Sequence, residues 1–258
     1  MQIWTIANQK GGVGKTTTTV ALGRELARRG KRVLLVDLDP HASLTRAFAI
    51  AEDPPPAGTM ELFASPPLEL ARLARESAMA GLSVVAAQPA LATLERRSAT
   101  QPGLGLALSQ ALARGRNDYD YALLDCPPTL GLLMVNALAA ADRLIIPTQT
   151  DPLALHGLDS MRRTATMIER SRRQPLPVSI LPTLYDRRTR SGVDSLARMR
   201  ETHDALVWGE QVPVDTRLRD ALNLATGPAN DAGGRGIDAY SRALDWLLAT
   251  HKALERAA

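Results

Sequence analysis

The feature that most constrains this chain is a glycine-rich loop between an apolar run and a helical pattern. The loop reads Lys10-Gly11-Gly12-Val13-Gly14-Lys15-Thr16-Thr17. The run from Ile3 to Ala7 is typical of a short buried strand, and Thr17 to Arg29 repeats apolar residues at helical spacing before Gly30. A strand, such a loop and a helix in this order predict a phosphate-binding site, because the loop N–H groups and the positive helix end face one point.

Each residue type in the loop has a predicted role. Lys15 is expected to reach the β- and γ-phosphates, and the Thr16 hydroxyl to bind Mg²⁺. The ordinary form of the loop has glycine six positions before this lysine, whereas here Gln9 takes that place and Lys10 follows it. The second lysine marks a variant form of the loop. Backbone N–H groups that surround the phosphates are expected from Gly11, Gly12, Val13, Gly14, Lys15, Thr16 and Thr17.

Two carboxylates follow a second apolar segment. The residues Val33 to Val36 lead into Asp37-Leu38-Asp39-Pro40, and ligand-binding groups gather at the carboxyl ends of parallel strands. At a strand end the two side chains need not point the same way, so Asp37 is predicted to face the magnesium shell and Asp39 the attacking water. A simple helix cap before Pro40 is the alternative reading.

A third apolar segment ends in one acid. Tyr121 to Leu124 is followed by Asp125, which is predicted to orient Mg²⁺ through water. Many nucleotide hydrolases place glutamate next, whereas Cys126 stands here, so the water-polarising group must come from elsewhere and Asp39 is the candidate. We expect Cys126 to be a small buried residue rather than a redox sensor.

Apolar, β-rich segments alternate with stretches of helical spacing along the chain. This alternation predicts an α/β fold with a mostly parallel sheet flanked by helices on both faces. Residues 53–67 carry several prolines and are predicted to form a surface excursion. A last helix is expected over 237–256, packed on the core through Tyr240, Leu244, Leu247 and Leu248. The expected strands are Ile3–Ala7, Val33–Val36, Leu82–Ala86, Tyr121–Leu124, Leu144–Ile146 and Val178–Leu181.

Length and composition narrow the class of protein. At 258 residues and 45% apolar, residues 1–258 are expected to form a single domain. One cysteine excludes an intramolecular disulfide and argues against a cysteine-held metal cluster within one subunit. His41 and His156 lack the spacing of metal ligands and are expected to be polar residues of loops. The N-terminus lacks the pattern of a signal peptide, and charged or polar residues interrupt the most apolar window, so we predict a cytoplasmic location without membrane insertion.

The net charge of +4 is unevenly distributed. Residues 156–219 contain 12 arginines, no lysine and eight acidic residues. A solvated face is one reading of this bias, and contacts to the phosphates of a nucleic acid are another. Composition leaves both open.

The loop is followed in order by four further motifs, which are Asp37-Leu38-Asp39-Pro40, Asp125-Cys126-Pro127-Pro128, Ile146-Pro147-Thr148-Gln149-Thr150 and Val212-Pro213-Val214-Asp215-Thr216-Arg217-Leu218. Together the five motifs resemble those of the ParA/MinD-type ATPases, and the resemblance covers nearly the whole chain. Ala7-Asn8-Gln9 before the loop and Pro40 after the acid pair are similar to the ParA/Soj branch. Tyr185-Asp186-Arg187-Arg188-Thr189 and Val214-Asp215-Thr216-Arg217 also resemble ParA-like ATPases encoded with chemotaxis arrays.

The resemblance implies an ATP-driven cycle with Mg²⁺ as cofactor. ATP would draw two subunits into a homodimer in which Lys10 of each reaches the phosphates of the other, with Gly11 small enough to fit the seam. Lys10, Lys15 and Asp39 would then be the catalytic residues, and Thr16, Asp37 and Asp125 the magnesium residues. Mutual neutralisation of closely apposed triphosphates gives this arrangement an electrostatic reason.

The resemblance also implies partners and a place in the cell. The dimer would bind DNA without sequence preference, through Arg188, Arg190, Arg217 and Arg219. The base of ATP would lie near Pro182 and Pro213, although ordinary loop packing fits those prolines as well. An activating adaptor, either ParB-like or from a chemotaxis array, and a nucleoid or polar location would follow. The alternatives are a MinD-like membrane-associated positioning ATPase and a biosynthetic ATP-dependent enzyme that shares the variant loop.

Overall fold

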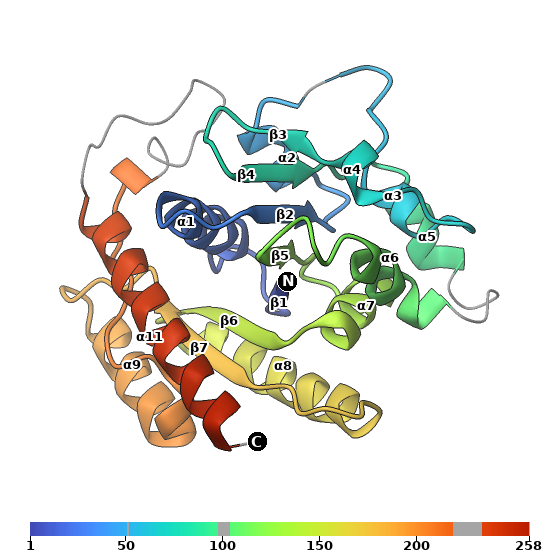
Figure 1. Cartoon of the computed structure of the whole chain (residues 1–258). Helices are drawn as coiled ribbons and strands as arrows, with labels where there is room; N and C mark the ends of the chain where they lie inside the picture. Colours follow the sequence, from blue (N-terminus) through green and yellow to red (C-terminus); the bar gives the residue numbers. More distant parts are fainter. Residues whose placement is uncertain (51, 98–103, 219–233, 258) are drawn as a thin grey trace.

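The fold is built on one seven-stranded sheet. A computed structural model of the chain describes residues 1–50, 52–97, 104–218 and 234–257, and Figure 1 shows their arrangement. The strand order is β3-β4-β2-β5-β1-β6-β7, and every neighbouring pair is parallel except β3 with β4. The strands are β1 (Gln2–Ile6), β2 (Val33–Asp37), β3 (Arg75–Glu76), β4 (Leu82–Val85), β5 (Tyr121–Asp125), β6 (Arg143–Gln149) and β7 (Val178–Thr183).

Helices cover both faces of this sheet, because each central strand is apolar on both sides. On one face α1 lies beside α11, which runs past it in Figure 1, while α6, α7 and α8 belong to the core cluster of the other face. The helices and 3-10 turns are α1 (Lys15–Arg28), α2 (Ser43–Ala47), α3 (Thr59–Leu62), α4 (Leu70–Leu73), α5 (Leu91–Arg97), η1 (Leu104–Leu106), α6 (Ala107–Arg114), α7 (Leu132–Ala140), α8 (Pro152–Arg170), α9 (Arg190–His203), η2 (Asp204–Leu206) and α11 (Arg235–Ala257).

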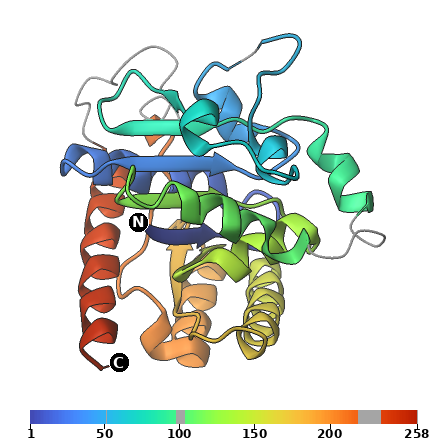
Figure 2. The same cartoon turned by 45° about the vertical axis from the view of Figure 1, so that its right-hand side comes forward.

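Parallel register brings the carboxyl ends of the central strands together. Ile6, Asp37 and Asp125 are aligned across β1, β5 and β2, so both acids stand where the glycine-rich loop begins. The arrowheads of β1 and β2 point the same way in Figure 2. The sheet therefore collects the predicted phosphate and magnesium residues at one edge.

The predicted α/β fold with a mostly parallel sheet is confirmed. The sequence missed β3, a two-residue antiparallel edge strand too short to show any period. The last helix packs as predicted: Tyr240, Leu244 and Leu247 are buried, and Tyr240 Oη lies 2.8 Å from Thr18 Oγ1 of α1. Among the described residues, no helix combines the length and the apolar character needed to cross a bilayer.

The prediction of a surface excursion over residues 53–67 was wrong for residues 58–63, which are buried or half-buried, whereas residues 53–55 and 64–66 are exposed. Thr59 and Leu62 are fully buried, and Thr59 Oγ1 donates a hydrogen bond of 2.7 Å to the backbone oxygen of Asp37. A composition rich in proline and small residues hides this contact, because it depends on a strand 22 positions earlier. These buried residues therefore form part of a wall behind the acid pair, Asp37 and Asp39.

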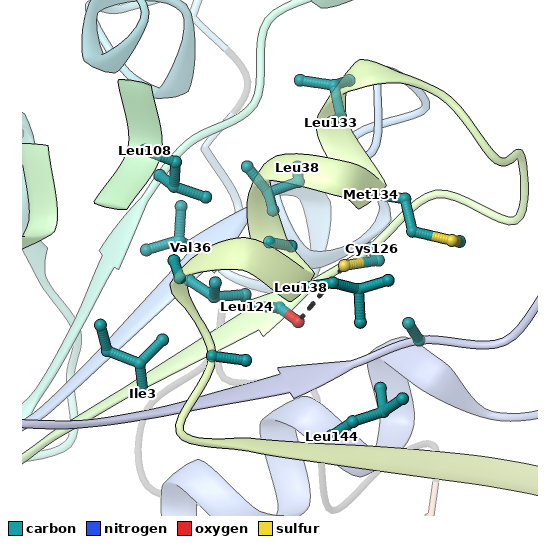
Figure 3. Packing of buried hydrophobic residues seen from close by; sticks show 14 of the residues in the cluster. Ile3, Val36, Leu38, Leu108, Leu124, Cys126, Leu133, Met134, Leu138 and Leu144 are labelled. Atoms are coloured by element: carbon teal, nitrogen blue, oxygen red, sulfur yellow. Dashed lines mark hydrogen bonds between the residues drawn. The ribbon is translucent and has the colours of Figure 1, made fainter. Parts of the chain in front are cut away.

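Cys126 lies in the core, as predicted. It is 1% exposed and packs among Leu124, Met134 and Leu138 in Figure 3, where the dashed line joins its sulfur to the Leu124 oxygen at 3.9 Å. Burial raises the pKa of this thiol well above its usual value, and the nearby Asp125 carboxylate adds to the effect. Cys126 is thus a packing residue held in its neutral form.

Candidate functional site

The glycine-rich loop joins β1 to α1 with two residues in the left-handed region. Gly12 has φ +75° and Gly14 φ +89°, a conformation that glycine adopts without steric cost. α1 begins directly after Gly14 and has no side-chain cap, so its first N–H groups point into the loop. The prediction that the loop offers backbone donors at a helix N-terminus is thus matched by the backbone geometry.

Lys15 is folded back over this loop. It is buried, and its Nζ donates to the backbone oxygen of Lys10 at 3.1 Å. Burial lowers the pKa of Lys15, and the charge of Asp125 opposes that shift. An ammonium group held above the loop donors is suitably placed for phosphate oxygens.

Thr16 and Asp125 meet beneath the loop. The Thr16 hydroxyl donates to Asp125 Oδ2 at 2.7 Å, and the Thr19 hydroxyl lies 3.3 Å from Oδ1. Burial, reinforced by the charge of Asp37, raises the pKa of Asp125 to about 8. A hydroxyl and a carboxylate in contact at a helix N-terminus fit a Mg²⁺ ion, which binds oxygen ligands and would favour the ionised acid.

Asp37 is buried at the end of β2 and is held by its own loop. Its Oδ1 accepts from the Asp39 N–H at 3.0 Å, and its Oδ2 accepts from the N–H and hydroxyl of Thr45 at 2.8 and 2.7 Å. Burial raises the pKa of Asp37 to about 6, against the lowering effect of these hydrogen bonds. Asp37 has no direct hydrogen bond to Thr16 within the described chain, so a role in magnesium binding would pass through water.

The Asp39 carboxylate has a different partner from that of Asp37, because it is held by His41. Its Oδ1 accepts the His41 N–H at 2.9 Å, and the Nδ1 of the His41 ring lies 2.8 Å from the same oxygen. The side chain of Asp39 is 14% exposed, whereas that of His41 is 79% exposed. His41 is a loop residue, as expected, and it lies beside the candidate catalytic acid.

In the described residues no three His, Cys, Asp or Glu side chains converge on a point that could hold a metal ion. Mg²⁺ keeps waters and uses one or two carboxylates together with substrate phosphates, so its expected ligands here are few. Thr16 would bind the ion, and Asp125 would orient it through water.

Lys10 lies on the outer side of the loop. Its Nζ is 3.5 Å from Asp151 Oδ1 at the start of α8, and its backbone N–H donates to Asn8 Oδ1 at 3.1 Å. A Cβ on Gly157 of α8 would lie 3.1 Å from the Lys10 Cβ, so the lysine rests closely against that helix. Gly11 beside it is exposed, and a Cβ there would meet nothing within 4 Å in its own chain.

The two proline segments proposed to lie near the nucleotide base are adjacent. Val212 N–H donates to the Pro182 oxygen at 2.9 Å, and Pro213 forms an isolated parallel bridge with Tyr185. Thr183 Oγ1 donates to the Val13 oxygen at 2.8 Å, and this hydrogen bond joins the proline segments to the glycine-rich loop. The sequence brought Pro182 and Pro213 together correctly, although a contact with a base stays a prediction.

The arginines predicted to contact DNA are exposed and individually paired. Arg188 binds Asp186 at 2.7 Å, and this pairing lowers the pKa of Asp186 to about 2. Arg190 and Arg217 lie 3.6 Å from Asp194 and Asp215. Arg219 lies outside the described residues. These side chains are accessible, but a phosphate must compete with an aspartate at each one.

Sequence reasoning missed two residues at this edge of the sheet. Asp151 caps α8 by accepting the Leu153 N–H at 3.0 Å, and an acid before proline is a recognisable helix start. Thr45 gave no such signal, since its partner lies eight positions away. His156 was expected in a loop, but it lies within α8, because Pro152 starts that helix one turn earlier.

Comparison with known proteins identifies the family of the chain. A family model described as an AAA domain matches residues 1–178. The sporulation initiation inhibitor protein Soj of Bacillus subtilis is 34% identical over 221 residues, which are 85% of this chain and 87% of that protein. The chain belongs to the ParA/Soj family. The chromosome-partitioning ATPase Soj of Thermus thermophilus, another relative, is 36% identical over 248 residues, covering 95% and 94% of the two chains.

Solved structures agree with this family and with its cofactors. A cobyrinic acid a,c-diamide synthase from Mycobacterium smegmatis, crystallised with ADP and magnesium, has a TM-score of 0.84 and 32% identity, covering 98% of this chain and 96% of that one. The ATP complex of a Cyanothece McdA variant has a TM-score of 0.85 at 21% identity, covers 96% of each chain, and supports the fold alone. ATP and Mg²⁺ are the cofactors that the cobyrinic acid a,c-diamide synthase structures, with ADP or an ATP analogue and magnesium bound, support for the family.

Proposed function

We propose that this chain is a magnesium-dependent ATPase that dimerises on binding ATP and acts as a spatial switch. The observation that carries the proposal is the division of the loop into two sides. Lys15, Thr16 and Asp125 are gathered by hydrogen bonds on the inner side, while Gly11 is exposed and Lys10 is half-buried beside Asp151. One lysine thus serves the chain's own nucleotide, and the other is available to a second subunit.

The residues divide the chemistry among them. Lys15 and the loop N–H groups would hold the phosphates, and Thr16 with Asp125 would hold Mg²⁺, which neutralises charge that develops on them. Asp39, whose Oδ2 has no hydrogen bond within the described part of the chain, would orient the attacking water. Lys10 of a partner subunit would neutralise the triphosphate from the far side.

Dimerisation and hydrolysis are separated by two variants. In sedimentation velocity with ATP and Mg²⁺, the unmodified chain and Asp39→Ala should form dimers, whereas Lys10→Ala should remain monomeric. Phosphate release should be lost in Asp39→Ala. Lys31→Ala, which changes an exposed lysine after α1, is the matched control. If Lys10→Ala formed ATP-dependent dimers at the same protein and ATP concentrations as the unmodified chain, the role of Lys10 would be refuted.

We further propose that the ATP-bound dimer binds DNA without sequence preference. Arg188, Arg190 and Arg217 are exposed, and such contacts to phosphates weaken steeply with salt. Fluorescence anisotropy with random duplex DNA should show tighter binding with ATP than with ADP. Arg188→Ala and Arg217→Ala should weaken it, and Arg163→Ala on α8 should not. Equal affinity of the two nucleotide states would contradict this part.

The proposal of a cargo and an activating adaptor is supported by the relatives of the chain and not by the geometry of the site. Relatives such as the chromosome partitioning protein ParA of Myxococcus xanthus, 36% identical over 217 residues, carry partition in their names. We propose that an adaptor, either ParB-like or from a chemotaxis array, stimulates slow hydrolysis and links the switch to a chromosome, plasmid or receptor array. ATP turnover measured with a ParB-like protein and, separately, with a chemotaxis-array adaptor distinguishes these cargoes.

A biosynthetic ATP-dependent enzyme is the second candidate. It is favoured by the likeness to the cobyrinic acid a,c-diamide synthase named above, at 32% identity. Such an enzyme should consume ATP only with its acid substrate and an amino donor, and DNA should not affect it. ATP turnover that rises with cobyrinic acid and glutamine would support this candidate over a switch.

A further inference from the structure

The loop from Asp37 to Thr45 carries the candidate catalytic acid and is fastened at its two ends. A carboxylate offers about four acceptor sites, and three of those on Asp37 are used within this segment. One takes the Asp39 N–H, and two take the N–H and hydroxyl of Thr45. Asp37 therefore ties the first turn of the loop to the start of α2.

Thr45 extends this tie to the neighbouring strand. It is 4% exposed, and while its hydroxyl proton goes to Asp37, the same oxygen accepts the Ala87 N–H at 2.8 Å just beyond β4. The hydroxyl is thus both donor and acceptor in a buried site. Its removal would leave Asp37 short of a donor and Ala87 short of an acceptor, and buried polar groups without partners are costly.

The position of Asp39 depends on this tie. Its backbone N–H is fixed by Asp37, and its side-chain Oδ1 is held by the backbone and ring of His41. The remaining oxygen, Oδ2, is left for a water. The buried Thr45 sets the backbone of the loop, and the exposed His41 sets the side-chain rotamer.

We propose that Thr45, assisted by His41, is a positioning residue for ATP hydrolysis that aims the Asp39 carboxylate through Asp37. This rests on the proposed function, in which Asp39 orients the attacking water. Neither residue contacts the phosphate-binding loop through a hydrogen bond in the described chain, so their loss should affect turnover rather than nucleotide binding.

The test compares Thr45→Val, which keeps the shape and removes the hydroxyl, with Thr45→Ser, which keeps the hydroxyl. The control is Thr166→Val, a surface threonine of α8. A hydrogen bond to a charged group lost in Thr45→Val should lower kcat about tenfold. In Thr45→Val, the KM for ATP and the affinity for ADP should stay within roughly twofold of the unmodified chain, and Thr45→Ser should restore kcat. A general loss of structure around the site would change nucleotide binding as well.

Wild-type kcat in Thr45→Val would overturn the proposal, and so would an equal fall in Thr45→Ser. If Thr45→Val does not fold, His41→Ala decides, because that side chain is exposed and its loss should lower kcat at unchanged ADP affinity. Wild-type kcat in His41→Ala would then overturn it. Asp39→Ala is measured in parallel: if it hydrolyses ATP normally, the proposed function fails, whereas if it alone is inactive, only the positioning role fails.

Discussion

The Thr16 hydroxyl donates to Asp125 Oδ2 at 2.7 Å, which joins the start of α1 to the end of β5 across 109 positions of sequence. If this pair holds Mg²⁺, Thr16→Ala should weaken the magnesium-dependent part of ATP binding by at least about tenfold, the lower limit of what loss of an outer-shell partner costs. Isothermal titration of ATP with Mg²⁺ and with EDTA measures that part. Thr16→Ser keeps the hydroxyl and is the control, and equal loss in both variants would contradict the role.

The buried acids predict how stability depends on pH. The pKa of Asp125 is raised from 3.8 to about 8 by burial, so the folded chain binds this proton more tightly than the unfolded chain does. Stability from this group is present at low pH and is lost as pH rises from about 4 towards about 8. With EDTA present, urea unfolding between about pH 5 and pH 8 should show a smaller fall for Asp125→Asn than for the unmodified chain. Parallel pH profiles would contradict this assignment.

Removal of the negative charge of Asp151 should make it easier for Lys10 to contact a partner subunit. Its Nζ lies 3.5 Å from Asp151, which also caps α8. Asp151→Asn keeps an oxygen for the cap and removes the counter-ion, so Lys10 should reach a partner's phosphates more easily. Because exposed pairs contribute little, the ATP concentration for half-maximal dimerisation should fall only about twofold to fivefold. Asp194→Asn on α9 is the control, and an unchanged or higher ATP requirement in Asp151→Asn would refute the expectation.

The sequence predicted those parts of the site whose residues are close in the chain. Lys10 to Thr17 are contiguous, and Asp37 and Asp125 each end an apolar run, so strand order alone brings them to one edge. The sequence did not predict Thr45, Thr59 or Ala87 as parts of the site. Their hydrogen bonds in the Asp37 region join segments that share no periodic pattern of apolar residues. The pairing of Arg188, Arg190 and Arg217 with aspartates was also missed, since composition counts charges without showing which of them meet.

Gly58 offers a test of the wall behind the acid pair. Its φ of −164° is extended backbone that any residue adopts, but a Cβ there would lie 2.1 Å from the Ala86 oxygen, a backbone atom that cannot rotate away. Gly58→Ala should therefore lower the free energy of unfolding by about 3 kcal/mol, the upper end for overpacking. Gly105→Ala is the control, because a Cβ at Gly105 would meet nothing within 4 Å.

Gly58→Ala should also affect the loop from Asp37 to Thr45, which carries the candidate catalytic acid. Thr59 follows Gly58, donates its N–H to the Ala86 oxygen at 2.8 Å, and holds the Asp37 backbone through its hydroxyl. Displacement of Thr59 should therefore lower kcat in the fraction that stays folded, while Gly105→Ala keeps both its stability and its turnover. Urea unfolding and ATP turnover measured on the same samples separate the two effects. A Gly58→Ala chain as stable as the original would show that Ala86 can move aside and that the wall is not rigid.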